Sequence, residues 1–177
     1  VATAGINPPT PSTVIVLGGG IYAKSSNLFL DNCEIADNYA FAYAVGGMLT
    51  SASSRGGGIY ATQDTHLQSN GTVIRGNQCG ATADRGTPYL EVANALGGGI
   101  CWEASGALTL KNCLIVENSV YSNPHYGARG GGVWIDQGSL EVVQSTVANN
   151  VTSGDSYEPN SLYSGIGSNR MNIDTKI

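Results

Sequence analysis

A recurring glycine triplet is the feature that most constrains the fold of this chain. It appears as GGGIY at 18–22 and 56–60, as GGGIC at 97–101 and as GGGVW at 130–134, with a degenerate SGIG at 164–167. The third glycines of successive copies are 38, 41, 33 and 33 residues apart. Periods in this range are typical of solenoids, propellers and other arrays of one repeated unit.

The residues inside each repeat alternate between apolar and polar. After the first triplet, Leu28 and Leu30 alternate along a short run, Asn32 breaks that run, and Ile35 and Asn38 follow. Short runs of period two, broken by Asn, Gly or Asp, predict strands rather than helices. We expect three strands per repeat, each pairing in parallel with its equivalents in the neighbouring repeats.

The predicted fold is therefore all-β: a right-handed parallel β-helix of about five coils, with loop inserts on one side. The handedness follows from the general bias of parallel crossovers. A propeller is the rival, but its antiparallel blades need tight hairpin turns, and only Asn70-Gly71 fits one. We expect a Pro-rich N-terminal arm over 1–13 and the β-helix domain over 14–177.

Equivalent positions predict columns of matching side chains. One residue type recurs at each inward slot because every coil presents the same surface to the next. Asparagines recur after the third strand, where a short amide tolerates a turn, and we interpret them as a structural ladder. The inward columns are Ile21/Ile59/Ile100/Val133/Ile166, Leu28/Leu67/Leu108/Leu140/Ile173 and Ile35/Ile74/Ile115/Val147, and the ladder is Asn38, Asn77, Asn118 and Asn150.

The pairing of these motifs resembles a known repeat. GGGI or GGGV followed by I-x-x-N or V-x-x-N is similar to the GGA[ILV] and FxxN repeats of polymorphic outer membrane proteins and related bacterial autotransporter passengers. The resemblance covers about residues 14 to 177. It implies a cell-surface or extracellular location and an adhesive or structural role.

Composition excludes several classes of partner. Only 12% of the residues are charged and the formal net charge is -5, so the basic stripe that nucleic-acid binding requires is missing. No apolar run has the length of a membrane span. The glycine triplets lack the strand-then-helix setting of a phosphate-binding loop. No CxxC or HxxxH spacing points to zinc, and we expect neither a metal nor a cofactor.

The four cysteines leave the disulfide state open. Cys79 follows the second coil, and Cys101 opens the first strand of the third coil and should face outward. The two form the candidate disulfide, since extracellular proteins favour such bridges. Spacing alone does not choose between this bridge and free thiols.

Two longer intervals and one aromatic line are candidate binding features. The intervals 39–55 and 78–96 lengthen the first two repeats, and such additions emerge as loops on one side of a solenoid. In the first, aromatics alternate at strand spacing, which indicates an extra strand or a binding loop. Tyr22, Tyr60 and Trp134 follow the inward residue of the first strand, so they point outward as a platform for carbohydrate or protein, unless the inserts cover them.

An enzyme is the alternative function, as polysaccharide lyases and glycosidases use this fold. Their chemistry needs converging carboxylates with a suitable neighbour. Glu103 and Asp136 share a position on successive coils and are the candidate catalytic pair. No Arg or His lies beside them in register, so we expect a protein that is not an enzyme.

The chain ends suggest self-association. Unpaired coil edges are templates for further pairing. We expect either subunits that stack head to tail into an extracellular fibre or a segment of a longer adhesin. The other expected partner is a glycan or protein of a host or cell surface. Candidate assembly contacts are Val14, Val16, Met171, Ile173 and Ile177.

Overall fold

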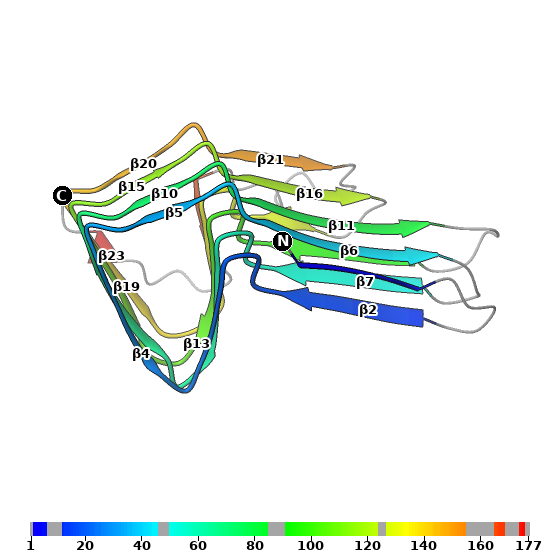
Figure 1. Ribbon diagram of the computed structural model, residues 1–177, viewed down its shortest axis with the longest axis horizontal. Coiled ribbons are helices and arrows are strands. Elements are labelled where there is room, and N and C mark those ends of the chain that lie inside the picture. Colours follow the sequence, from blue (N-terminus) through cyan, green and yellow to red (C-terminus); the bar gives the residue numbers. More distant parts are fainter. Residues whose placement is uncertain are drawn as a thin grey trace.

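The computed structural model describes residues 2–6, 12–45, 50–84, 91–123, 127–154, 165–168 and 174–175. In these residues the chain forms 23 strands in five parallel sheets (Figure 1). Sheet A contains β1 (Ala2–Ile6), β6 (Tyr39–Val45), β11 (Gln78–Asp84), β16 (Ser119–Asn123) and β21 (Val151–Gly154). Sheet B contains β2 (Ser12–Leu17), β7 (Thr50–Arg55), β12 (Glu91–Leu96) and β17 (Ala128–Arg129).

The other three sheets carry the remaining strands. Sheet C contains β3 (Ile21–Lys24), β8 (Ile59–Gln63), β13 (Ile100–Ala104), β18 (Val133–Ile135) and β22 (Ile166–Ser168). Sheet D contains β4 (Asn27–Asp31), β9 (His66–Asn70), β14 (Ala107–Lys111), β19 (Ser139–Val143) and β23 (Asp174–Thr175). Sheet E contains β5 (Glu34–Ala36), β10 (Val73–Arg75), β15 (Leu114–Val116) and β20 (Thr146–Ala148).

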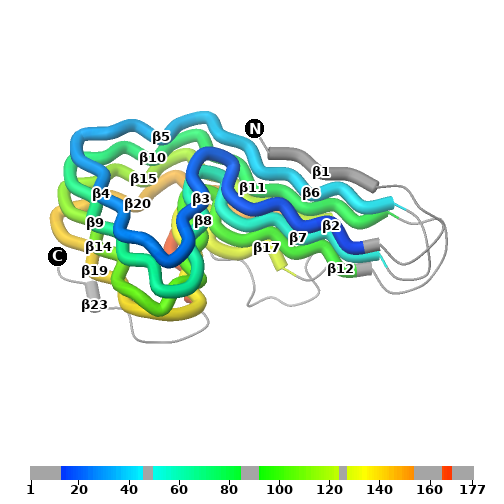
Figure 2. The backbone as a smooth tube through the Cα atoms, turned by 60° about the horizontal axis from the view of Figure 1, so that its bottom comes forward, coloured from blue at the N-terminus to red at the C-terminus, as the bar shows by residue number. Residues whose placement is uncertain are grey.

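The chain passes through sheets B, C, D, E and A in turn and then repeats the circuit one level along the axis (Figure 2). In the described residues every strand pair is parallel, as in β3 with β8 and β8 with β13. The predicted all-β parallel solenoid is thereby confirmed. Each coil holds five strands, however, and not the three that the sequence predicted.

Sheets C, D and E enclose a triangular solenoid (Figure 1). Its interior is mainly aliphatic, with Trp102 and Cys113 among the core residues. The predicted inward columns are confirmed: Ile21, Ile59, Ile100, Val133 and Ile166 pair in register, as do Leu28, Leu67, Leu108 and Leu140, and Ile35, Ile74, Ile115 and Val147. Ile173 lies outside the described residues. In the middle coils these side chains are fully buried, and each contributes about 2 kcal/mol of hydrophobic stabilisation.

Sheets A and B form a second unit, the two-sheet extension, which projects from one corner of the triangle (Figure 1). The intervals 39–55 and 78–96, which we expected to be loops, supply β6, β7, β11 and β12. The alternative of an extra strand was right for the first of them. Residues of the expected arm, 1–13, also join the solenoid: β1 pairs with β6, and β2 pairs with β7 from Ser12 onward.

Small side chains explain how the two-sheet extension packs. Its inner residues are mostly alanine, with two valines of β2 among them. Alanines at every second position bring sheets A and B close together, so that Ser54 Oγ of β7 donates a hydrogen bond across the gap to the carbonyl oxygen of Ala40, at 2.9 Å. The inner side chains include Ala40, Ala42, Ala44, Ala52, Ala81, Ala83, Ala93, Ala95, Cys79 and Val120.

The glycine triplets close the neck between the two units. Gly97 has a φ of +68°, a left-handed conformation that favours glycine. A Cβ on Gly98 would overlap the backbone of Gly131 and lie 2.6 Å from the carbonyl oxygen of Ser119. A Cβ on Gly99 would lie 2.6 Å from the carbonyl oxygen of Gly132 and 3.1 Å from the Asn118 amide nitrogen. The first glycine of the triplet is therefore required by its backbone conformation, and the second and third by the close approach of the next coil.

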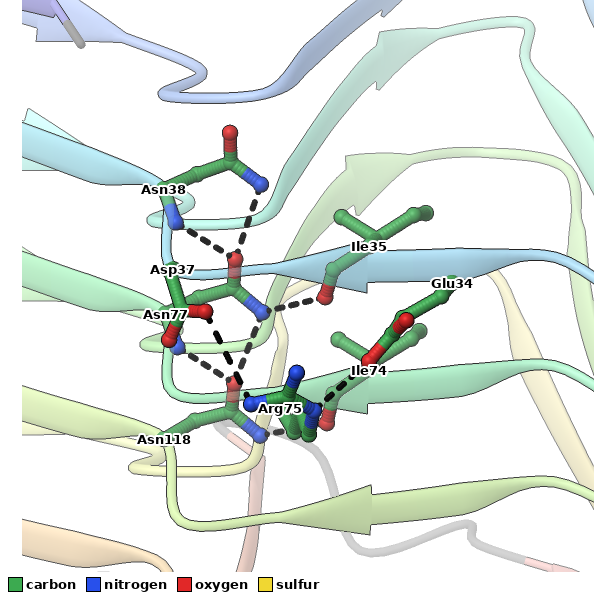
Figure 3. A network of polar contacts seen from close by, with 8 residues as sticks. All are labelled: Glu34, Ile35, Asp37, Asn38, Ile74, Arg75, Asn77 and Asn118. Carbon is green, nitrogen blue, oxygen red and sulfur yellow. Dashed lines mark hydrogen bonds and ion pairs between the residues drawn. The ribbon is translucent and has the colours of Figure 1, made fainter.

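The asparagine ladder lies on the other side of that neck, where the chain leaves the triangle (Figure 3). Asn77 Nδ2 donates to Asn118 Oδ1 at 2.9 Å and to the Ile35 carbonyl oxygen at 2.9 Å, and the Asn77 backbone N–H donates to Asn118 Oδ1 at 3.0 Å. The same pattern joins Asn38 to Asn77 and Asn118 to Asn150. These asparagines are structural, since their polar atoms hold one coil to the next.

Candidate functional site

The sequence-predicted site residues converge where the outer face of sheet B meets the outer face of sheet C, which we call the corner. Sheet B contributes Arg55 and Leu96, and sheet C contributes Tyr60, Glu103 and Trp134. The chain turns from one sheet into the other at the glycine triplets, which brings the two outer faces into contact. The positions of these residues on their strands thus bring an Arg, a Glu and two aromatic side chains together.

The predicted row of aromatic residues lies on sheet C, but sheet B covers most of it. Tyr22, Tyr60, Cys101 and Trp134 pair in register along sheet C. Tyr22 is 50% exposed and stacks on Tyr60 at 5.5 Å, whereas Tyr60 and Trp134 are only 6% and 1% exposed. Leu96 packs on this cluster, and the Arg129 guanidinium lies 5.5 Å from the Trp134 ring centre. Sheet B, to which the intervals 39–55 and 78–96 contribute β7 and β12, covers two of the three aromatics. The expected alternative of coverage by the inserts therefore holds for these two, and a platform of all three is wrong.

Glu103 does not stand as a free carboxylate. Its Oε1 accepts a hydrogen bond from Arg55 Nε at 2.7 Å, and its Oε2 accepts one from the Tyr60 hydroxyl at 2.9 Å. Burial, and then the Glu103 charge, raise the pKa of Tyr60, so the phenol stays protonated and keeps donating. Arg55 belongs to the interval that we expected to be a loop, which is why the sequence did not place it beside Glu103.

Asp136 lies one coil beyond Glu103. It follows Ile135, which pairs with Trp102, and its backbone N–H donates to the Trp102 carbonyl oxygen at 2.9 Å. The two candidate acids are therefore neighbours on sheet C, as predicted. The hydrogen bonds that Glu103 accepts from Arg55 and Tyr60 include one that joins sheet B to sheet C. This contact holds the extension against the triangle.

The two cysteines of the candidate disulfide are free thiols, which is the second of the two alternatives that spacing left open. Cys79 and Cys101 are free and buried in different clusters, Cys79 among the alanines of the extension and Cys101 in the corner. The alternation of β11 turns Cys79 inward, which the loop interpretation missed. Burial raises the pKa of Cys79 to about 11 and also raises that of Cys101, so both remain protonated thiols at neutral pH.

The candidate assembly contacts have a different role where the structure describes them. Val14 and Val16 are 4% and 5% exposed and pack inside the two-sheet extension. They are core residues, so their assignment as assembly contacts is wrong. Met171, Ile173 and Ile177 lie outside the described residues.

A second candidate site lies on the outer face of sheet D, where the surface holds an open depression of about 310 Å³. No prediction from the sequence pointed to it. Its outward residues differ in type from coil to coil, so they leave no repeat signal, and only the strand register brings them together. The depression is lined by Phe29, Leu30, Asp31, Gln68, Ser69, Asn70, Thr109, Lys111 and Glu141.

Two further properties concern the described residues alone. Within them, no group of three or more His, Cys, Asp or Glu side chains is arranged to hold a metal ion. The same part of the chain has no helix whose length and apolar character would let it cross a membrane.

Comparison with known proteins gives one match. Residues 12–172 match the family model described as the right-handed β-helix region. No curated protein and no solved structure matches the chain. The match includes strands of all five sheets and leaves out β1 and β23.

Proposed function

Because the chain belongs to the right-handed β-helix family, we propose that it is a non-catalytic extracellular scaffold with a structural or adhesive role. The coils supply a rigid frame, since backbone pairing and the asparagine ladder hold each level to the next. Exposed side chains on the outer faces then supply contacts to other molecules.

The proposal depends on one observation, that both carboxylate oxygens of Glu103 accept hydrogen bonds from other side chains. A carboxylate that acts as an acid, base or nucleophile must reach the substrate. Both oxygens of Glu103 are instead bound, one by Arg55 and one by Tyr60, and the side chain is only 23% exposed. The corner thus favours a structural role over hydrolysis or elimination.

The proposed location rests on the repeat motif and composition. The glycine triplets and the I-x-x-N or V-x-x-N segments resemble repeats of polymorphic outer membrane proteins and autotransporter passengers, which act at the cell surface. Low charge and abundant glycine are compatible with such a setting. We therefore place the adhesive role outside the cell.

Two assays on the full chain test the proposal. We expect it to remain attached to cultured epithelial or bacterial cells after washing and to release no reducing or unsaturated ends from acidic or neutral polysaccharides. Glu103→Gln should leave attachment unchanged while lowering thermal stability, because it weakens the contact with Arg55. Polysaccharide cleavage that disappears in this variant would instead assign the corner to catalysis.

The open edge of the first coil favours a second role, head-to-tail stacking of subunits. Strands β3, β4 and β5 lie at the ends of their sheets. Asn38 Oδ1 accepts no hydrogen bond from the described residues, while the equivalent oxygens of Asn77 and Asn118 each accept two (Figure 3). This edge therefore offers acceptors to an incoming coil of a second copy.

Stacking predicts particles larger than the 18.2 kDa chain, whose size grows with concentration in light scattering. Tyr22→Pro should suppress this growth. In β3 the Ile21 N–H donates to the second coil, so the Tyr22 N–H faces the open edge, and proline removes that donor. Tyr22→Ala is the matched control and should still assemble. A constant mass near that of one chain would exclude stacking.

A further inference from the structure

Phe29 projects from the outer face of sheet D beside the depression. It is 71% exposed, the highest value among the large apolar side chains in the described part of the chain. Its neighbours Leu28 and Leu30 point inward, so the strand alternation fixes Phe29 outward. An aromatic ring presented on a flat sheet offers an apolar face for stacking.

Polar groups continue the row that begins at Phe29. Gln68, Thr109 and Glu141 occupy the equivalent position on the next three coils. Among the described residues, the side chains of Gln68 and Thr109 have no hydrogen-bond partner, so their donors and acceptors are available to a ligand. The row therefore combines one apolar surface with a series of hydrogen-bonding groups.

A second row forms a pre-ordered polar wall along the depression. Asn70 Nδ2 donates to Asp31 Oδ1 at 2.9 Å, and Asn112 Nδ2 donates to Asn70 Oδ1 at 3.0 Å. These contacts fix the orientation of the Asn70 amide before any ligand arrives. Groups held in place lose little conformational entropy on binding, which favours recognition.

From this combination we propose that the depression on sheet D binds a neutral oligosaccharide, an inference that rests on the proposed adhesive function and names its ligand. A sugar offers an apolar C–H face to Phe29 and hydroxyl groups to the amide and hydroxyl side chains. A ligand that runs along the axis contacts equivalent side chains on successive coils.

Backbone pairing and charge disfavour the main competitors. The strands β9 and β14 are paired on both sides, so most of the depression offers no free backbone groups to a peptide that adds as a strand, and such a peptide could pair only with the outer edge of β4. The depression carries the carboxylates of Asp31 and Glu141 against the single ammonium of Lys111. An anionic polysaccharide would meet net repulsion there.

Calorimetric titration of the full chain tests the inference. The ligands are soluble oligomers of neutral hexoses and of N-acetylhexosamines, with an oligouronate as the anionic comparison. We expect at least one neutral oligomer to bind, and Phe29→Ala to weaken that binding by about tenfold. The matched control is Tyr121→Ala, which removes an exposed aromatic on the outer face of sheet A and should leave affinity unchanged.

The outcomes separate this inference from the proposed function. If no neutral oligomer binds, if the oligouronate binds more tightly, or if Phe29→Ala binds as well as the parent chain, the glycan site is refuted. Attachment to cells that survives both Phe29→Ala and periodate oxidation of cell-surface sugars would retain the adhesive role without this site. Cleavage of a bound oligomer would retain the site and refute the non-catalytic role.

Discussion

Gly98→Ala is expected to destabilise the native solenoid severely. The added methyl group would overlap the carbonyl oxygen of Gly131 in the next coil and lie 2.6 Å from the carbonyl oxygen of Ser119. Both obstacles are backbone, which cannot move aside without breaking the pairing of neighbouring coils. We expect a loss of roughly 4 kcal/mol in the free energy of unfolding, the range reached by severe core substitutions. Urea denaturation followed by circular dichroism measures it.

Gly165→Ala is the matched control for this substitution. Gly165 pairs with the last glycine of the fourth triplet, but a Cβ there has no atom within 4 Å. The control should therefore be as stable as the parent chain. Equal stability of the two variants would show that backbone contact at the neck does not account for the glycine triplets.

Asn118→Ala is expected to cost about 3 kcal/mol of unfolding free energy. It removes a fully buried amide that joins three coils, so the Asn77 backbone N–H loses its partner, and the Asn77 side-chain amide and the Ile74 carbonyl oxygen each lose one hydrogen bond. Asn118→Asp should be similarly damaging, since a carboxylate cannot donate to Ile74 and its charge is buried. Chemical denaturation gives the size of the loss, and hydrogen exchange of the Asn77 amide gives its location.

The end of the ladder supplies the control. Asn38 is only partly buried, and its Oδ1 has no donor among the described residues. Asn38→Ala should therefore cost clearly less than Asn118→Ala. A loss of the same size at both positions would contradict the view that reciprocal hydrogen bonds give the ladder its strength.

The sequence predicted the triangular solenoid because its slots repeat chemically. Ile59, Ile100 and Val133 recur at one position of each repeat, and a recurring aliphatic residue implies a stacked column. The asparagines were equally readable, since they recur at the same distance from the aliphatic residue before them.

The two-sheet extension left a weaker signal. Its inner surface is alanine, which does not stand out as an apolar run, so β7 and β12 were taken for parts of loops. Because β7 was taken for part of a loop, Arg55 was not placed beside Glu103, and the hydrogen bonds of Glu103 could not be predicted. The depression on sheet D was invisible for another reason: Phe29, Gln68 and Thr109 are chemically different, and their proximity follows from register alone.

Spacing along the chain did hold one usable clue. In the four regular repeats, the third glycine and the following ladder asparagine are 18 or 19 residues apart, which is the length of the triangular part. The distance from that asparagine to the third glycine of the next copy varies from 14 to 22 residues. The constant length thus corresponds to the triangular solenoid, and the variable length corresponds to the two-sheet extension.

The neck between the triangular solenoid and the two-sheet extension has an evolutionary consequence. Each coil is closed there by backbone contacts of the glycine triplet and by one asparagine side chain. Changes in the length of the strands of the two-sheet extension therefore do not alter the cross-section of the triangular solenoid. Insertions and deletions can accumulate in the projecting layer while the frame keeps its dimensions. A protein built this way can diversify the surface of its extension at little structural cost, and an engineer could graft new recognition segments at the same place.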